Sequence, residues 1–189
     1  NAKAGIDAAL TTMRKHGKDL PIMISLTVSD LAGRTLSGQT VEAFLASLSP
    51  YPIFSVGMNC AFGAPQMKPF IQKIGAIAPW YISAHPNAGL PNEMGEYDET
   101  PESMAPKIKE FIDEGLVNII GGCCGTSPEF IARYNEMAKG KRPHQLVEKP
   151  KTMWLSGLDI LDVDDHVKLP MDASRFVNVG ERCNVAGSR

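Results

Sequence analysis

The sequence lacks the features of several protein classes. None of its apolar runs approaches the roughly 18 residues that a membrane-spanning helix needs, and its N-terminal residues show no signal-peptide pattern. Basic residues are not in excess, because 19 Lys and Arg accompany 21 Asp and Glu, for a net charge of −2. The composition gives no reason to expect a nucleic-acid or membrane partner, so we expect a cytoplasmic protein.

Cysteine is scarce, with 4 in 189 residues. A small secreted protein held together by disulfides would need a denser framework, so metal binding or catalysis is the better expectation for these thiols. No initiator methionine and no strand pattern precede the first helical pattern, at residues 2–16. We therefore expect the chain to begin inside a domain.

The sequence does contain a regular alternation of strand and helix patterns. After the first helix, β-type apolar runs lie at residues 20–28, 53–58, 80–84 and 116–120. Each is followed by a helical pattern, and these begin near residues 41, 65, 101 and 128. Four consecutive strand-to-helix units with short connections predict an α/β fold with a parallel sheet flanked by helices.

Such a sheet is either open and doubly wound or part of a barrel, and two observations favour the barrel. No Gly-x-Gly-x-x-Gly motif follows any of the strands. The polar clusters capable of chemistry all lie at the C-terminal ends of strands, where (β/α)8 barrels build their sites: Ser29 and Asp30, Asn59 and Cys60, His85 and Asn87, Cys123 and Cys124. A whole barrel needs ~250 residues and eight strands, so we expect the C-terminal half of a (β/α)8 TIM barrel.

The pattern changes after Gly140, and three parts are expected. Residues 1–140 form the half barrel. Residues 141–174 are charged, contain proline and carry several aspartates, which is typical of an ordered inter-barrel linker lying along a surface. Residues 175–189 contain one more strand running into a polar turn, and we expect this to be the first strand of a second (β/α)8 barrel.

The adjacent thiols of Cys123 and Cys124 lie where a buried strand passes into a helix start. Neighbours on a regular strand face opposite sides, but the flanking glycines permit the turn that would bring both thiols to one target. Cys60 ends another parallel strand, so in a barrel its thiol would reach the same mouth. Three soft thiolates suit zinc and would leave one coordination position open, as in catalytic sites, whereas a structural site uses four protein ligands. Inert buried cysteines or a vicinal disulfide remain alternatives on the residues alone.

Several motifs resemble the homocysteine-binding module of the cobalamin-dependent methionine synthases. They are Gly-Met-Asn-Cys at 57–60, Gly-Gly-Cys-Cys-Gly-Thr at 121–126, Gly-Arg-Thr-Leu-Ser-Gly-Gln-Thr at 33–40 and Ala-His-Pro-Asn-Ala-Gly-Leu-Pro at 84–91. The resemblance implies a methyltransferase that binds zinc through Cys60, Cys123 and Cys124 and converts homocysteine to methionine. The cysteine pattern is also similar to that of homocysteine methyltransferases that take the methyl group from betaine or S-methylmethionine.

Residues 176–188 distinguish between these methyltransferases. They resemble the opening of the methyltetrahydrofolate-binding barrel of methionine synthases, an extension that the simpler enzymes lack. The resemblance implies methylcobalamin as the methyl donor, recharged from 5-methyltetrahydrofolate, with the folate and cobalamin modules in the same longer protein. It also implies folate contacts from the motif residues Glu181, Arg182, Cys183 and Asn184.

Three further polar residues lie at strand ends that face the expected mouth. Asp30, Asn59 and Asn87 have side chains that could bind the amino group of homocysteine or occupy the open zinc position, although each is equally suited to hold a loop. A protein from another class, a structural zinc scaffold closed by a fourth protein ligand, is the remaining alternative to an enzyme.

Overall fold

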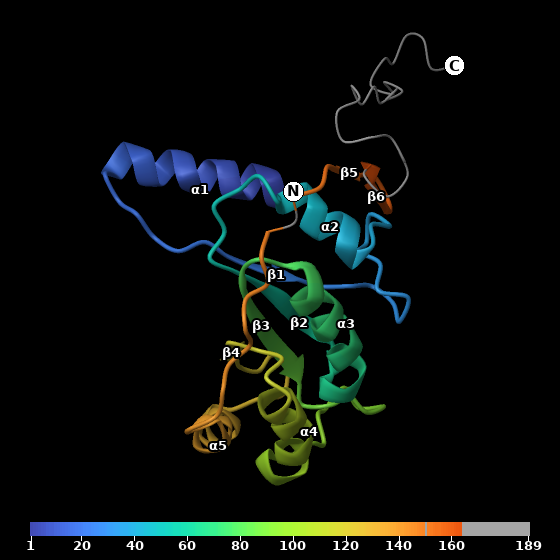
Figure 1. Ribbon diagram of the computed structural model, residues 1–189. Coiled ribbons are helices and arrows are strands. Elements are labelled where there is room, and N and C mark those ends of the chain that lie inside the picture. Colours follow the sequence, from blue (N-terminus) through green and yellow to red (C-terminus); the bar gives the residue numbers. More distant parts are fainter. Residues whose placement is uncertain (150, 164–189) are drawn as a thin grey trace.

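A computed structural model describes residues 1–149 and 151–163 of this chain, and its helices and strands alternate as expected (Figure 1). The elements in chain order are α1 (Ala2–His16), β1 (Met23–Leu26), α2 (Val41–Leu48), β2 (Ser55–Gly63), α3 (Ala64–Ile77), β3 (Tyr81–Asn87), α4 (Pro101–Asp113), β4 (Ile119–Ile120), α5 (Pro128–Ala138), β5 (Trp154–Ser156) and β6 (Ile160–Asp162). None of the helices in these residues is long and apolar enough to cross a membrane.

The first four strands form one parallel sheet in the order β1-β2-β3-β4. Strand order therefore equals chain order, so every helical crossover moves the chain one strand further in the same direction. A doubly wound sheet reverses its strand order near the middle, whereas a (β/α)8 barrel does not. The sheet is thus consistent with an arc of such a barrel, as predicted.

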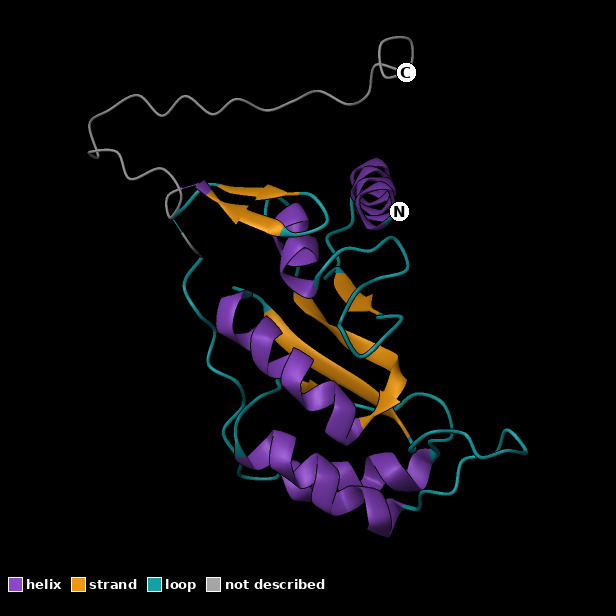
Figure 2. Cartoon of the chain, turned by 90° about the vertical axis from the view of Figure 1, so that its right-hand side faces the viewer, coloured by secondary structure: helices purple, strands orange, loops and turns teal. Residues whose placement is uncertain are grey.

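The hydrophobic core lies between this sheet and the helices that follow its strands. Val56, Met58, Ile82 and Ala84 on the two central strands have no exposed surface. Helix α3 packs against β2 and β3, and Figure 2 shows it along one side of the sheet. Because this face is fully buried, the sheet holds the C-terminal ends of its strands in fixed positions.

Side chains fix the starts of two of these helices. The Thr40 hydroxyl accepts a hydrogen bond of 3.2 Å from Ala43 N at the start of α2. Thr100 and Ser103 form a reciprocal capping box at the start of α4. Both caps satisfy backbone N–H groups that have no partner inside the helix.

The strand limits differ from those predicted. Strands β1 and β4 are shorter than their apolar runs, whereas β2 and β3 continue through the polar residues at their ends to Gly63 and Asn87. The two central strands can continue because they pair with each other up to Gly63 and Asn87, across a register shift that begins at Asn59. Apolar character alone therefore marks the buried middle of a strand rather than its end.

The predicted linker contains an antiparallel hairpin, β5 and β6, which the sequence analysis did not foresee. It is bound to the start of α2, because Thr40 N donates to Leu158 O (2.8 Å) and the Ser156 hydroxyl donates to Ala43 O (2.6 Å). Earlier in the linker, Lys149 Nζ donates a hydrogen bond to Ser49 O at the C-terminal end of α2 (2.9 Å). The rest of the predicted linker, residue 150 and residues 164–174, and the predicted strand within 175–189 lie outside the described residues.

A pair of glycine substitutions tests the packing of the sheet. A β-carbon at Gly57 would lie 1.8 Å from Ser83 O, whereas one at Gly5 in α1 would meet nothing within 4 Å. We expect Gly57→Ala to lower the free energy of unfolding by more than about 3 kcal/mol. Gly5→Ala is expected to raise it by about 0.5–1 kcal/mol, since alanine is the better helix former.

Chemical denaturation of the two variants and the unchanged protein measures both effects. Equal stability of Gly57→Ala and the unchanged protein would contradict the close pairing of β2 and β3.

Candidate metal centre

The sulfur atoms of Cys60, Cys123 and Cys124 all lie within 4.8 Å of one another. The Sγ atoms of Cys60 and Cys124 are 3.5 Å apart, and those of Cys123 and Cys124 are 3.9 Å apart. Tetrahedral zinc with Zn–S bonds of about 2.3 Å places its sulfur ligands about 3.8 Å from one another. The three thiols therefore have the spacing of a zinc-ligand set.

These three cysteines are free thiols, and each is partly exposed. The 3.9 Å between Cys123 and Cys124 is far longer than the ~2.05 Å of a disulfide bond. The structure thus contradicts a vicinal disulfide, and it also contradicts inert, fully buried cysteines.

Cys60 reaches the cluster through an unusual backbone conformation. Cys60 and Ala61 have φ angles of 57° and 59°, the only positive values among the non-glycine residues described. They lie in a bulge where the pairing of β2 with β3 shifts between Asn59 and Gly63. A bulge re-aims a side chain, and each left-handed residue that carries a β-carbon costs roughly 1–2 kcal/mol. Such strain is typical of functional sites.

The loop that carries the other two thiols is attached to the end of β3. Cys123 N donates to Pro86 O (3.0 Å), Cys124 N donates to Asn87 Oδ1 (3.2 Å), and Ala88 N donates to Cys124 O (2.9 Å). The backbone of both cysteines is thereby fixed to a neighbouring strand. This arrangement produces the turn between adjacent thiols that the sequence required.

The pKa values of two of the clustered thiols are shifted in opposite directions. Burial opposes ionisation of Cys60, but the Ala61 N–H and contacts from the Cys124 and Cys123 thiols and from Asn87 outweigh it and lower the pKa of Cys60. Burial, followed by the contacts with Cys60 and Cys124, raises the pKa of Cys123. The surroundings thus favour the thiolate form of Cys60 and the neutral thiol form of Cys123.

The sequence of this region matches a known family. A family model described as homocysteine S-methyltransferase matches residues 1–138. The chain belongs to the homocysteine S-methyltransferase family. The match spans helices α1 to α5 and the four strands of the parallel sheet, and it contains the three clustered cysteines.

The predicted homocysteine-binding residues occupy different places in this methyltransferase fold. Asn87 is only 4% exposed, and its Oδ1 accepts a hydrogen bond of 3.2 Å from Cys124 N. Asn59 Oδ1 accepts hydrogen bonds from Ser25 Oγ (2.7 Å) and Thr27 Oγ1 (3.3 Å). Asn87 thus adjoins the thiols, whereas Asn59 connects the end of β2 to that of β1.

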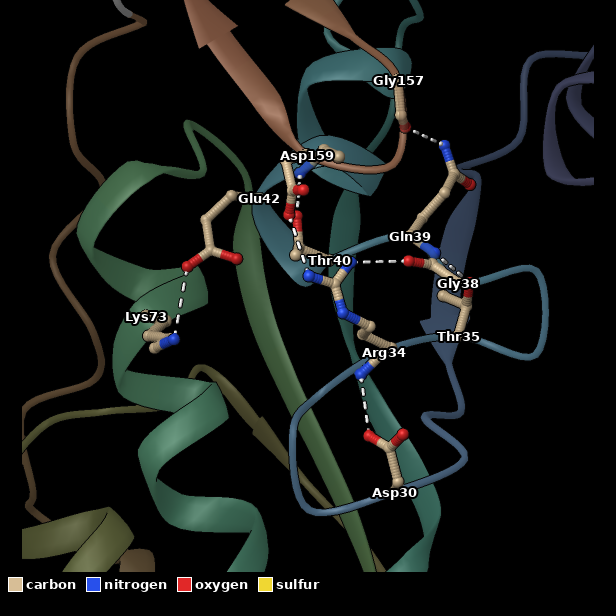
Figure 3. Close-up of polar contacts among 11 residues, drawn as sticks. Asp30, Arg34, Thr35, Gly38, Gln39, Thr40, Glu42, Lys73, Gly157 and Asp159 are labelled. Atoms are coloured by element: carbon tan, nitrogen blue, oxygen red, sulfur yellow. Dashed lines mark hydrogen bonds and ion pairs between the residues drawn. The ribbon is translucent and has the colours of Figure 1, made fainter.

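Asp30 lies in the exposed loop after β1. Its carboxylate accepts a hydrogen bond of 3.2 Å from Arg34 N, and Figure 3 shows the two residues facing each other across the turn. The Arg34 guanidinium donates to Gly38 O (2.8 Å) and pairs with Asp159 of the hairpin loop (3.2 Å). These contacts describe a loop-forming role for Asp30. The predicted folate contacts Glu181, Arg182, Cys183 and Asn184 lie outside the described residues.

Tyr97 is a residue of this region that the sequence analysis missed. Its ring packs against Gly125, where a β-carbon would lie 2.4 Å from Tyr97 Cγ. The neighbouring Cys124 thiol, followed by burial, raises the pKa of Tyr97. No periodicity or motif spacing marks Tyr97, because it lies in the long loop between β3 and α4.

His85 is half-buried beside the cysteine loop, and a β-carbon at Gly121 would lie 2.5 Å from its ring. Burial lowers the pKa of His85 below its ordinary value of 6.5. The folded state disfavours the protonated ring, so stability from this residue is complete above pH 6.5 and is lost as the pH falls through the lowered pKa.

We expect His85→Gln to make the free energy of unfolding less dependent on pH between about pH 7.5 and 5 than in the unchanged protein. His16→Gln, at the exposed end of α1, is the matched control and should leave the slope as it is. Chemical denaturation at several pH values measures both variants. An unchanged slope in His85→Gln would show that the ring is not held neutral by burial.

Proposed function

We propose that this chain supplies the zinc site of a cobalamin-dependent methionine synthase. In this proposal homocysteine receives a methyl group from methylcobalamin, which is recharged from 5-methyltetrahydrofolate. The family match supports methyl transfer to homocysteine, and the sulfur cluster supports zinc dependence. The observation that carries the proposal is the convergence of three free thiols from two strand ends within 4.8 Å.

The residues of the chain would hold and order the reactants. Cys60, Cys123 and Cys124 would bind zinc, and three protein ligands leave one coordination position for the substrate. When bound, zinc lowers the pKa of a coordinated thiol, so that homocysteine can react as a thiolate near neutral pH. Asn87 Oδ1 accepts a hydrogen bond from Cys124 N, and Asn87 itself pairs with Gly63 of β2, so β3 would keep the two ligand segments in register.

The choice of methyl donor rests on the end of the chain. The family match ends at residue 138, so the last 51 residues lie outside it. Residues 176–188 resemble the start of a methyltetrahydrofolate-binding barrel. We propose that residues 1–140 form the half barrel, 141–174 the linker and 175–189 the start of a folate-binding domain with Glu181, Arg182, Cys183 and Asn184 at its site.

Two alternatives make different demands on the chain. A methyltransferase that uses betaine or S-methylmethionine would need the residues after 140 to be an unrelated extension. Methyl-transfer assays of the full-length protein with each donor in turn separate the two, since only the proposed enzyme depends on a corrinoid. A structural zinc scaffold would need a fourth protein ligand, and within the described residues the cluster of potential ligands contains the three cysteines alone.

Replacement of the clustered cysteines tests the zinc site. We expect Cys60→Ala, Cys123→Ala and Cys124→Ala each to lose zinc and homocysteine methylation, while methyl transfer from folate to cobalamin stays largely intact. The reason is that two thiolates cannot complete a catalytic zinc site of three protein ligands. Zinc content of the purified full-length variants, measured by elemental analysis, is the primary readout.

Cys183→Ala is the matched control, because Cys183 has no thiol neighbour in the sequence, and it should keep its zinc. Full zinc occupancy in any one of the three cluster variants would remove that residue from the ligand set.

Zinc-edge X-ray absorption distinguishes an enzyme from a scaffold. We expect three sulfur ligands per zinc in the full-length protein and four after homocysteine is added, because an open position remains for the substrate. Homoserine, with a hydroxyl in place of the thiol, should leave the count at three. A site already saturated by four protein ligands, and unchanged by homocysteine, would favour the scaffold.

A further inference from the structure

The left-handed conformation of Cys60 and Ala61 needs support from outside the bulge. Both residues carry a β-carbon, and their φ angles of 57° and 59° lie in a region that such residues avoid. Conformations of this kind persist only where the surrounding packing fixes them. The next residue, Phe62, has a large side chain that is buried. Its packing therefore fixes the C-terminal side of the bulge.

Phe62 packs against the helix that follows β2. Strand β2 ends at Gly63 and α3 begins at Ala64, so no loop separates the bulge from the helix. The rings of Phe62 and Phe70 are stacked, with centroids 6.0 Å apart and an angle of 17° between their planes. This separation is within the range of favourable aromatic pairs. Because Phe70 is buried as well, Phe62 cannot turn away without displacing it.

Phe70 is also in contact with the loop between β1 and α2. A β-carbon at Gly33 would lie 2.4 Å from Phe70 Cε1 and 3.0 Å from Phe70 Cδ1, so the Gly33 backbone lies directly against the ring. Gly33 N donates a hydrogen bond to Asp30 O (3.1 Å), which closes the turn at this point. The Phe70 ring is therefore held by Phe62 and by the loop together.

The linker hairpin holds this loop in place, as Figure 3 shows. The Arg34 guanidinium pairs with Asp159 (3.2 Å), and Gln39 Nε2 donates to Gly157 O (3.1 Å). An exposed ion pair contributes little by itself, but here it acts together with hydrogen bonds to the backbone of the hairpin. A continuous series of contacts thus runs from the hairpin, through the loop and two aromatic rings, to the bulge.

We propose that Phe70 is a positioning residue of the metal centre, which acts through Phe62 to keep Cys60 turned toward the other two thiols before the metal binds. The loop and the linker hairpin hold Phe70 in turn. The Sγ atoms of Cys60 and Cys124 are 3.5 Å apart, so the ligand set is assembled. Apparent affinity falls in proportion to the fraction of molecules that have the binding-competent conformation. This inference rests on the proposed zinc-dependent function.

Two alanine substitutions in the loop between β1 and α2 form a matched pair. Gly33→Ala places a methyl group against Phe70 and must displace the ring, whereas Gly38→Ala meets only Leu158 Cδ2, at 3.5 Å. Both glycines are left-handed, with φ angles of 76° and 83°, so the backbone cost of alanine is similar. The probe is Co²⁺, added to the full-length protein after its metal is removed. The sulfur-to-cobalt charge-transfer band reports thiolate binding directly.

We expect the affinity for Co²⁺ to fall about 10-fold in Gly33→Ala, as it would if about a tenth of the molecules kept Cys60 in position. Gly38→Ala should bind Co²⁺ as the unchanged protein does. Zinc affinity, measured by competition with a chelating dye, should follow the same order. At saturation the band should reach full intensity in Gly33→Ala, because the metal itself draws Cys60 back into the bulge conformation.

A second pair tests the aromatic stack itself. Phe70→Leu removes the ring that stacks on Phe62, and Phe111→Leu removes a fully buried ring from α4. Both variants lose packing in the core, and chemical denaturation measures how much stability each loses. Only Phe70→Leu should lose metal affinity, again by about 10-fold. A lower final band intensity in Phe70→Leu alone also supports the inference, since a ligand out of position no longer binds.

Unchanged cobalt affinity in Phe70→Leu overturns the inference, and so does an equal fall in Phe111→Leu, which would show a general loss of packing. If Phe70→Leu does not fold, the glycine pair decides, and equal affinities of Gly33→Ala and Gly38→Ala overturn it. The function on which it rests is tested separately. If the unchanged protein shows no sulfur-to-cobalt band, the zinc site itself is contradicted, and the role of Phe70 is contradicted with it.

Discussion

The candidate site depends on the attachment of Cys124 to the end of β3. The Asn87 side-chain oxygen accepts a hydrogen bond from the Cys124 N–H, and the Ala88 N–H donates one to the Cys124 carbonyl oxygen. The same strand pairs with β2, which carries Cys60, up to Gly63 and Asn87. Strand β3 thus connects the two segments that carry the thiols. Because β3 lies between β2 and β4 in the sheet, it is the one strand able to make this connection.

Most of the architecture followed from the sequence for a definite physical reason. Parallel strands joined by helices put all their C-terminal ends on one edge, so residues 63 positions apart, Cys60 and Cys123, could be placed together without any contact information. The polar clusters that follow the strands then indicated that the site lies at this edge. Strand ends were less accurate, because pairing between β2 and β3 extends past the apolar residues into Gly63 and Asn87.

The features that sequence reasoning missed arise from tertiary contacts. The left-handed conformation of Cys60 and Ala61 has no local signal, since neither residue favours it, and the surrounding pairing imposes it. The position of Tyr97 is determined by a turn built on Asn92 and by the absence of a side chain at Gly125. The hairpin of β5 and β6 has strands of only three residues each, too short to show a sequence pattern, and it is hydrogen-bonded to the start of α2.

The separation of the thiols along the chain affects the stability of the protein and its resistance to proteolysis. A metal held by Cys60 and the Cys123–Cys124 pair would act as a cross-link that closes a loop of more than 60 residues. In the chain-entropy description used for disulfides, such a closure restricts the unfolded chain by about 4 kcal/mol. That is comparable to a large part of the stability of an ordinary domain. A cell short of zinc would therefore hold a chain that not only lacks activity but also unfolds more often, and it would be exposed to proteolysis before it could be reloaded.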